Sequence, residues 1–296
     1  MSRRAVRPIL AAVLSLAALA TACAPADDDT ASTTNSPTSS TSTSTDACAK
    51  ESLETLTSGS LTIGTDKPAY EPWFVDDDPT NGEGFESAVA YAVAEELGFT
   101  EAEVTWVPVK FDAAIQPGEK PFDFDINQFS VTAERQAVVD FSSPYYDVTQ
   151  TVITTGGSKA AGATSLADLK GVKLGAQVGT TSLAAINEVI APSSDAAVFN
   201  SNDDAKIALE NGQIDALVVD LPTAFFITAA ELDDGKIIGQ LPAGGGEQEQ
   251  FGLLLDKDSA LTDCVSRAVD ALRDAGTLDQ LEQEWLAQAA GAPVLQ

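Results

Sequence analysis

The chain has 296 residues, 45 of them acidic and 16 basic, which gives a formal net charge of −29 at pH 7. A field of that sign repels nucleic acid and anionic lipid headgroups, so both are excluded as binding partners of the folded part. The sequence contains no histidine and only three cysteines, none of them in a CxxC pair, which excludes histidine-based catalysis and the common zinc and redox motifs.

The N-terminus has the pattern of an export signal. Three arginines precede an apolar run from Ile9 to Ala20, which is well short of the roughly 20 residues needed to span a bilayer. We therefore predict a signal peptide over residues 1–22. Small residues lead into Cys23 and resemble a bacterial lipobox, which would make Cys23 the lipidated first residue of the mature protein. Ordinary secretion with an incidental Cys23 is the alternative.

The segment that follows is predicted to be a disordered tether over residues 23–47. Residues 24–46 include 13 serines and threonines and no large apolar side chain, so they cannot bury a core. The tether would hold the folded part at the outer face of the cytoplasmic membrane, with the lipid as its only membrane contact. If Cys23 carries the lipid, Cys48 and Cys264 remain in an oxidising compartment, and we predict a disulfide between them.

The folded part begins with strands and helices in alternation. We expect strands at 61–64, 104–107 and 122–127, and a helix from Phe85 to Leu97 whose apolar residues share one face and which Gly98 ends. After Thr149 a second alternating set is expected. Its members are strand 174–176, helix 181–190, strand 197–199, helix 203–211, strand 216–219 and helix 222–230. The chain is then expected to return through 251–255 to a helix at 259–275 and a last helix from 277. This alternation favours an α/β fold with parallel strands.

Residues 123–146 contain the first candidate binding group. Ser130, Thr132 and Arg135 follow an apolar strand and precede FSSPYY, which we interpret as a turn. A guanidinium is a planar fork of donors suited to a carboxylate, and neighbouring hydroxyls can complete its shell. We therefore predict a carboxylate site here. The alternative is that Arg135 is a surface residue paired with Glu134 or Asp140.

Two further candidates lie at the ends of predicted strands, where ligands bind in open α/β sheets. Gly179, Thr180 and Thr181 open a helix, whose free N–H groups attract an anion. Asp220 directly follows strand 216–219 and can accept from an ammonium, although it could instead cap the next helix. A carboxylate grip and an ammonium acceptor together describe an α-amino acid ligand.

Six segments in this order carry a resemblance over nearly all of the chain after the tether. They are IGTDKPAYEPW (63–73), GFESAVAYAVAEELG (84–98), FSVTAERQAVVDFSSPYY (129–146), SLADLKGVKLGAQVGTTS (165–182), ALENGQIDALVVDLP (208–222) and DALRDAGTLDQLEQEWL (270–286). The chain resembles the extracellular solute-binding proteins that feed polar amino acids to ABC importers. The resemblance implies the type II periplasmic-binding-protein fold, two lobes that are each a mixed sheet flanked by helices.

The same resemblance implies how the chain is divided. Lobe 1 would comprise residues 48–148 plus 249–296, and lobe 2 would comprise residues 149–248. The chain would cross between them at a two-crossing hinge, near Val148–Val152 and again near Gly246–Gln250. Both ends of the folded part would then lie in lobe 1, which agrees with the predicted disulfide.

Carried over residue by residue, the resemblance implies a set of ligand-binding residues. Arg135, Ser130, Thr132 and Thr181 would hold the ligand carboxylate, Asp220 the ammonium, and Asp66, Tyr70 and Phe111 the ligand side chain. The aromatic residues could equally be core packing. Asn127 and Gln128 depart from the small residues commoner in the family and lie beside the predicted pocket, so we add Gln128 to the set. Asp66 and Glu71 favour a polar or basic amino acid over glutamate or aspartate.

The resulting functional prediction is a monomeric binding lipoprotein, not an enzyme, that captures an amino acid and delivers it to an ABC permease. The alternatives are an enzyme on the same fold, similar to cyclohexadienyl dehydratase, and a ligand-sensing lipoprotein. We expect no cofactor and no metal. The acidic run Asp76–Asp78 could suggest calcium, but a loop counted from Asp76 or from Asp78 lacks glycine at its sixth position, so we interpret the run as a solvated turn.

Overall fold

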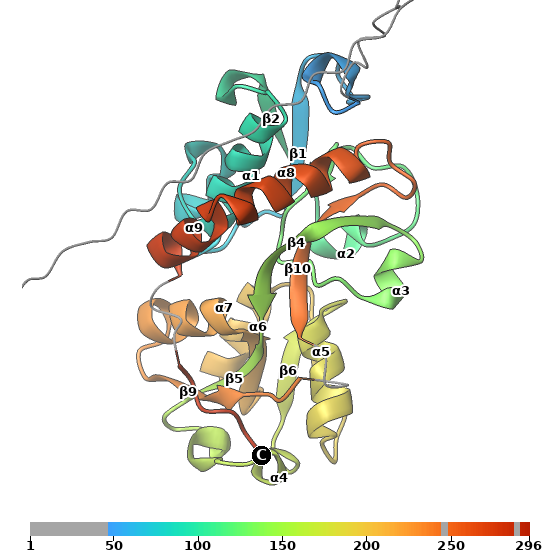
Figure 1. Ribbon diagram of the computed structural model, residues 1–296. Coiled ribbons are helices and arrows are strands. Elements are labelled where there is room, and N and C mark those ends of the chain that lie inside the picture. The colour runs from blue at the N-terminus through green and yellow to red at the C-terminus, as the bar shows by residue number, and fades with distance from the viewer. Residues whose placement is uncertain (1–46, 244–247, 287–290) are drawn as a thin grey trace, which may run out of the picture. The chain divides into compact units, whose positions relative to one another are not determined.

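The computed structural model describes residues 47–243, 248–286 and 291–296. The predicted signal peptide, Cys23 and most of the predicted tether lie outside these residues, as do residues 246 and 247 of the predicted second crossing. Within the described part, two sheets of five strands each carry their own flanking helices (Figure 1). We call the part built on the first sheet lobe 1 and the part built on the second sheet lobe 2.

Lobe 1 is a mixed sheet with the strand order β2-β1-β3-β10-β4. Its strands are β1 Leu61–Thr65, β2 Val104–Pro108, β3 Phe124–Asp125, β4 Asp140–Val148 and β10 Glu249–Leu255, and its helices are α1 Phe85–Glu96, α2 Phe111–Ala114, α3 Ala133–Gln136, α8 Thr262–Asp274 and α9 Thr277–Trp285. The first three strands are parallel, and β10 pairs antiparallel with both β3 and β4. Strand β3 is shorter than the predicted 122–127.

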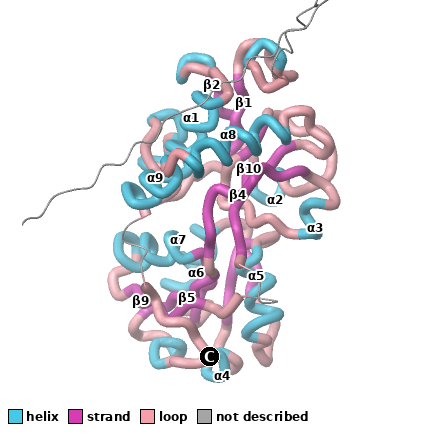
Figure 2. Tube along the Cα trace, in the orientation of Figure 1, coloured by secondary structure: helices cyan, strands magenta, loops and turns pink. Residues whose placement is uncertain are grey.

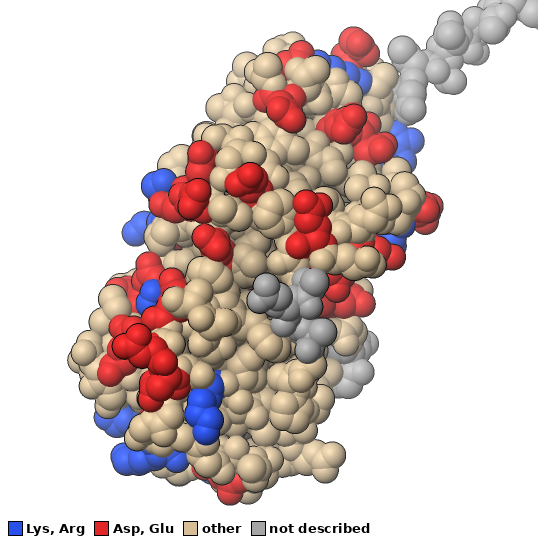
Figure 3. Space-filling model, turned by 90° about the vertical axis from the view of Figure 1, so that its left-hand side faces the viewer, with Lys and Arg blue, Asp and Glu red and all other residues tan. Residues whose placement is uncertain are grey.

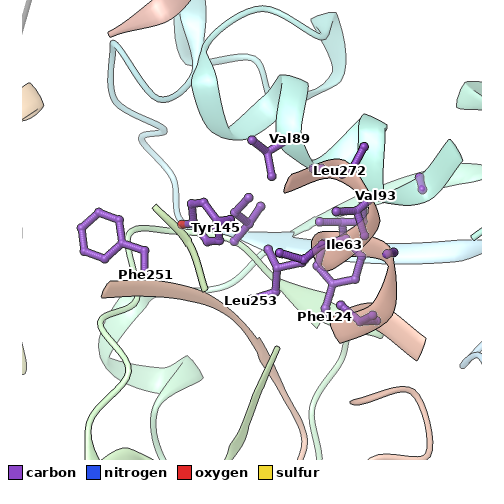
Figure 4. Close-up of a cluster of buried hydrophobic side chains, with 14 of the residues drawn as sticks. Ile63, Val89, Val93, Phe124, Tyr145, Phe251, Leu253 and Leu272 are labelled. Atoms are coloured by element: carbon purple, nitrogen blue, oxygen red, sulfur yellow. The ribbon is translucent and has the colours of Figure 1, made fainter. Parts of the chain in front are cut away.

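The core of lobe 1 forms where α1 and α8 cover one face of this sheet. Val89 and Val93 of α1 are fully buried, because they recur at the four-residue spacing that places side chains on one helix face. They meet Ile63, Phe124 and Leu253 from the sheet and Leu272 of α8 (Figure 4). This packing fixes the position of the strand ends from which the cleft residues project.

Lobe 2 has the strand order β7-β6-β8-β5-β9. Its strands are β5 Gln150–Thr155, β6 Leu174–Gln177, β7 Ala197–Phe199, β8 Ala216–Asp220 and β9 Gly235–Gln240, and its helices are α4 Leu166–Leu169, α5 Thr181–Ala185, α6 Asn202–Glu210 and α7 Leu221–Phe226. Helices α5 and α7 each continue as a single π-helical turn. Along β8, Val218 packs into one buried cluster and Leu217 into the cluster on the opposite face. Burial on both faces explains why this strand is an unbroken apolar run.

The FSSPYY segment is a strand, so the predicted turn is wrong. It forms most of β4, which runs beside β10 over nearly its whole length (Figure 2). Pro144 fits because β4 is the edge strand of its sheet and the ladder shifts register there, and an edge strand tolerates a residue without an N–H. Strand β4 ends at Val148 and β5 begins at Gln150, so the chain passes from one sheet to the other at Thr149.

The C-terminal residues correct the predicted division, which assigned everything from 249 to 296 to lobe 1. Val294 forms a bridge with Gln240 of β9, and Leu295 is buried in a core cluster of lobe 2. The carbonyl of Gln296 accepts from the N–H of Leu166. Residues 291–296 therefore pack on lobe 2. The sequence did not predict this packing, because Leu295 is a single apolar residue and forms no periodic pattern with its neighbours.

The structure contains the predicted disulfide between Cys48 and Cys264, whose Cα atoms are 5.4 Å apart. Cys264 lies on α8 and is buried against the lobe 1 core. The bridge therefore ties the start of the folded part to a helix that follows the second passage of the chain into lobe 1.

Gly84→Ala is expected to destabilise the fold by more than about 2 kcal/mol. Gly84 precedes α1 with φ +96°, and an added Cβ would lie 2.5 Å from the carbonyl oxygen of Trp73. Gly82→Ala is the matched control, because Gly82 also has positive φ, at +74°, but its nearest neighbour would be 4.0 Å away. Urea unfolding of both variants measures the difference, and equal losses of stability would contradict the steric account.

Candidate functional site

A cleft lies at the carboxyl ends of strands β1, β6 and β8, where each parallel strand leads into a loop or a helix. Its empty volume is about 530 Å³, a figure that includes space open to solvent. Seven of the nine predicted ligand-binding residues line it: Asp66, Tyr70, Phe111, Gln128, Ser130, Thr181 and Asp220. The described lining also includes residues that the sequence reasoning did not assign, among them Gln150, Gln177, Asn202 and Phe251.

Arg135 lies behind this lining. Its guanidinium donates from Nη1 to the carbonyl of Ser130 at 2.7 Å and from Nη2 to the carbonyl of Gly179 at 2.8 Å, and it sits over the ring of Phe111. Burial lowers the pKa of Arg135 to about 10, and the group stays charged. Only 7 % of Arg135 is exposed, so the surface ion-pair alternative is wrong. The arginine joins Ser130 of lobe 1 to the loop before α5 of lobe 2.

Thr132 has a local role in the structure. Its side chain accepts from the N–H of Arg135 at 3.2 Å and caps the N-terminus of α3. A cap of this kind satisfies one of the free donors at a helix start. Thr132 therefore fixes the short helix that carries Arg135, and it is not among the described residues that line the cleft.

Asp220 combines the two roles considered for it from the sequence. It caps α7, accepting from the N–H and the hydroxyl of Thr223, both at 2.9 Å, and it also lines the cleft. The indole of Trp73 in lobe 1 donates to the same Thr223 hydroxyl at 2.8 Å. Burial raises the pKa of Asp220 to about 6, since the hydrogen bonds from Thr223 offset only part of the desolvation. Above that pH the cleft holds a buried carboxylate that an ammonium would neutralise.

Gln128 is positioned by a buried acid. Glu86 of α1 accepts from both the N–H and the side-chain amide of Gln128, and from the hydroxyl of Tyr145. Gln128 adopts a positive φ of 47°, a strained conformation for a residue with a side chain. Burial raises the pKa of Glu86 to about 7. The buried glutamate therefore holds Gln128 at the cleft wall.

Aromatic side chains form another wall of the cleft. Phe111 stacks on Phe129 with ring centroids 4.8 Å apart, so one face of its ring is core packing while the residue also lines the cleft. Asp66 accepts from the N–H groups of Lys67 at 2.6 Å and Phe111 at 3.1 Å. Burial raises the pKa of Asp66. The hydroxyl of Tyr70 is also buried.

Glu249 is the functional candidate that the sequence reasoning missed. Its carboxylate accepts from the hydroxyl of Ser130 at 2.5 Å, the hydroxyl of Thr181 at 2.6 Å and the amide of Gln150 at 3.1 Å. Gln150 and Glu249 both lie inside the stretches predicted to cross between the lobes. That placement was the available signal, because residues at a crossing face the space between the two sheets.

The electrostatic character of the cleft is acidic. Among its described lining residues, Asp66 and Asp220 are carboxyl groups and none is lysine or arginine. The face of the molecule in Figure 3 likewise shows many more acidic than basic side chains.

The part of the chain that the structure describes contains no cluster of residues suited to hold a metal ion. Within the same part, no helix combines the length and apolar character that crossing a bilayer requires.

The comparisons with known proteins agree with this architecture. Residues 61–288 match the family model of bacterial extracellular solute-binding proteins, family 3. The chain is similar to a probable histidine-binding protein of Campylobacter jejuni, with 29 % identity over 239 residues that cover 78 % of this chain and 87 % of that protein.

Two solved structures show the same two-lobed, type II periplasmic-binding-protein fold. An ancestral arginine-binding protein bound to arginine aligns with a TM-score of 0.63 and 30 % identity, covering 77 % of this chain and 98 % of that one. An ancestral amino acid-binding protein described as a precursor of cyclohexadienyl dehydratase also aligns with a TM-score of 0.63 and 30 % identity, covering 77 % and 95 %.

Proposed function

The chain belongs to the bacterial extracellular solute-binding proteins of family 3, and we propose that it binds a free amino acid in the cleft between its lobes. The observation that carries the proposal is that the cleft has a carboxylate suited to a ligand ammonium and, separately, hydroxyl donors suited to a ligand carboxylate. Asp220 of lobe 2 is a buried carboxylate placed for an ammonium, while Ser130 of lobe 1 and Thr181 of lobe 2 present hydroxyls near the buried Arg135. Donors near a fixed cation suit a carboxylate.

The proposed ligand is a basic or polar amino acid. The described lining carries two carboxyl groups without a basic partner in the lining, so a positively charged ligand side chain would lower the electrostatic energy of the cleft. Asp66 stands beside Tyr70 and Phe111, where it can accept from a distal donor while the rings cover the aliphatic part. Glutamate and aspartate would add a negative charge to an acidic site and are expected to bind poorly.

The proposed setting is the outer face of the cytoplasmic membrane. We propose that residues 1–22 are removed, that Cys23 carries lipid, and that the monomeric protein delivers its ligand to an ABC permease. Closure around the ligand would be a population shift that contacts from both lobes stabilise. Intact-mass measurement of the mature protein from the membrane tests the lipid on Cys23, and an unmodified Cys23 would contradict it.

A thermal-shift screen against the common amino acids tests the binding proposal. A ligand present at about 1,000 times its Kd stabilises a protein by about 4 kcal/mol, a rise in Tm of roughly 10 °C for a domain of this size. We expect such a rise with arginine, histidine, lysine or glutamine and none with aspartate or glutamate. No stabilisation by any amino acid would contradict the proposal.

An enzyme on the same fold is a second candidate, favoured by two observations. Asp220 has a pKa of about 6 in the cleft, which suits a general acid, and one structural neighbour is described as a dehydratase precursor. We expect no turnover of prephenate or arogenate, because the proposed role of Asp220 is to bind an ammonium in its ionised form. Measured turnover that Asp220→Asn abolishes would establish the enzyme instead. A ligand-sensing lipoprotein is the third candidate. It would be favoured if the protein binds an amino acid but does not interact with an ABC permease.

A further inference from the structure

The carboxylate of Glu249 is held by both lobes at once. Ser130 belongs to lobe 1, whereas Thr181 is the first residue of α5 and Gln150 the first residue of β5 in lobe 2. All three donate to the Glu249 carboxylate, the two hydroxyls at 2.5 and 2.6 Å. Bonds to an ionised acceptor are shorter and stronger than neutral ones. The protein itself thus supplies a carboxylate that bridges its lobes.

These donors are the ones that the proposed function assigns to a ligand carboxylate. Ser130 and Thr181 have one hydroxyl proton each, and each proton is directed to Glu249. The negative charge of Glu249 also favours the charged form of Arg135 and opposes its desolvation. A second carboxylate cannot take the same donors while Glu249 keeps them, and two adjacent carboxylates repel each other.

We propose that Glu249 sets the affinity for α-amino acids: in the unliganded protein its carboxylate fills the place of the ligand's α-carboxylate, which displaces it on binding. The inference rests on the proposed function and deepens it. Glu249 is only partly buried at the first residue of β10, so its side chain can swing away while the strand stays paired. The exchange lowers the affinity for every α-amino acid by the free energy of the bonds that Glu249 gives up.

If the Glu249 carboxylate occupies an anion site, a small free carboxylate should bind at that site once the Glu249 side chain has been removed. In Glu249→Ala, acetate at constant ionic strength is expected to raise Tm in a saturable way, whereas chloride is not. The wild-type protein should show no such acetate effect. Glu134→Gln is the matched control, because the exposed Glu134 also contributes negative charge to Arg135 and is not one of the acceptors of the cleft hydroxyls. It should behave as the wild type does.

A pair of probes that differ only by a carboxylate tests the specificity. In titration calorimetry, the Kd for L-arginine should be at least roughly tenfold lower in Glu249→Ala than in the wild type. A tenfold change in Kd is equivalent to about one charge-assisted hydrogen bond. Agmatine, which is arginine without the carboxylate, should bind Glu249→Ala no more tightly than the wild type. Glu249→Gln keeps an acceptor but loses the charge, so its affinity for L-arginine should lie between the two.

The opposite results would overturn the inference. If Glu249→Ala binds L-arginine more weakly and loses agmatine as well, Glu249 is a fixed wall that contacts the ligand cation. If acetate stabilises the wild type and Glu249→Ala equally, the carboxylate of Glu249 does not occupy the anion position. Acetate stabilisation of Glu249→Ala alone, with no amino acid binding to either protein, supports the anion site at Glu249 and contradicts the proposed amino-acid function.

Discussion

Asp220→Asn is expected to weaken amino acid binding by roughly 30-fold to several thousand-fold, the cost of about 2–5 kcal/mol for removing one charge of a buried hydrogen-bonded pair. The substitution isolates the charge, because asparagine can still accept from the N–H of Thr223 and is itself a good N-cap. Stability should therefore change little while affinity falls. Titration calorimetry and urea unfolding of the same variant measure the two effects.

The matched control is Asp215→Asn, which makes the same change just before the opposite end of β8. Asp215 accepts from the N–H of Lys173 at 2.8 Å and is not among the described residues of the cleft lining. Its affinity for amino acids should equal that of the wild type. Equal losses in both variants would show that a structural effect on β8, rather than an ammonium contact at Asp220, explains the result.

The same residue predicts a pH dependence of binding. Because a bound ammonium favours ionised Asp220, the complex holds fewer protons than the free protein below the pKa of about 6, and affinity should fall as pH falls through 6. The expected slope approaches roughly tenfold per pH unit below the pKa. Glu86 titrates nearby, with a pKa of about 7 to which the charge of Asp220 contributes. In Asp220→Asn, any pH dependence of binding that remains does not come from titration of Asp220.

Removing the disulfide is expected to cost about 5 kcal/mol of stability, because the bridge closes a loop with a sequence separation of 216 and the chain-entropy stabilisation grows with loop length. Cys48→Ala with Cys264→Ala should lower Tm by roughly 10–20 °C. Urea unfolding of the double variant and of the wild type with and without reductant measures this loss.

Reductant serves as the control within that experiment. It should destabilise the wild type and leave the double variant unchanged. Ligand affinity should be retained, since neither cysteine is among the described residues lining the cleft. Equal stability of the oxidised wild type and the double variant would contradict a stabilising role for the bridge.

Much of the fold could be predicted where burial imposes a simple pattern. The parallel strands of lobe 2 are covered on both faces, so β6 and β8 are short apolar runs, and the predicted strand at 197–199 coincides with β7. Strands β4, β5 and β9 were missed because their pairing is antiparallel and depends on distant partners. In β4, Ser142, Ser143 and Pro144 have the composition of a turn, and the edge position and a register shift accommodate them.

The candidate site divides in the same way. Residues at the carboxyl ends of parallel strands, such as Asp66 and Asp220, could be predicted because such strand ends meet at one edge of a sheet. For Gln150 and Glu249 the sequence offered only their place in the predicted crossings, because their contacts depend on how the chain passes between the sheets. The placement of Arg135 behind the lining follows from carbonyl groups in both lobes, which no local pattern encodes.

The central claim is that Asp220 and the donors around Arg135 hold the two ends of one amino acid. A crystal structure of the protein with its tightest-binding amino acid tests this most directly. We predict the ligand ammonium within about 3 Å of the Asp220 carboxylate, its carboxylate on Ser130 and Thr181, and Glu249 displaced. A ligand bound elsewhere, or one with its carboxylate directed away from Ser130 and Thr181, would contradict the account.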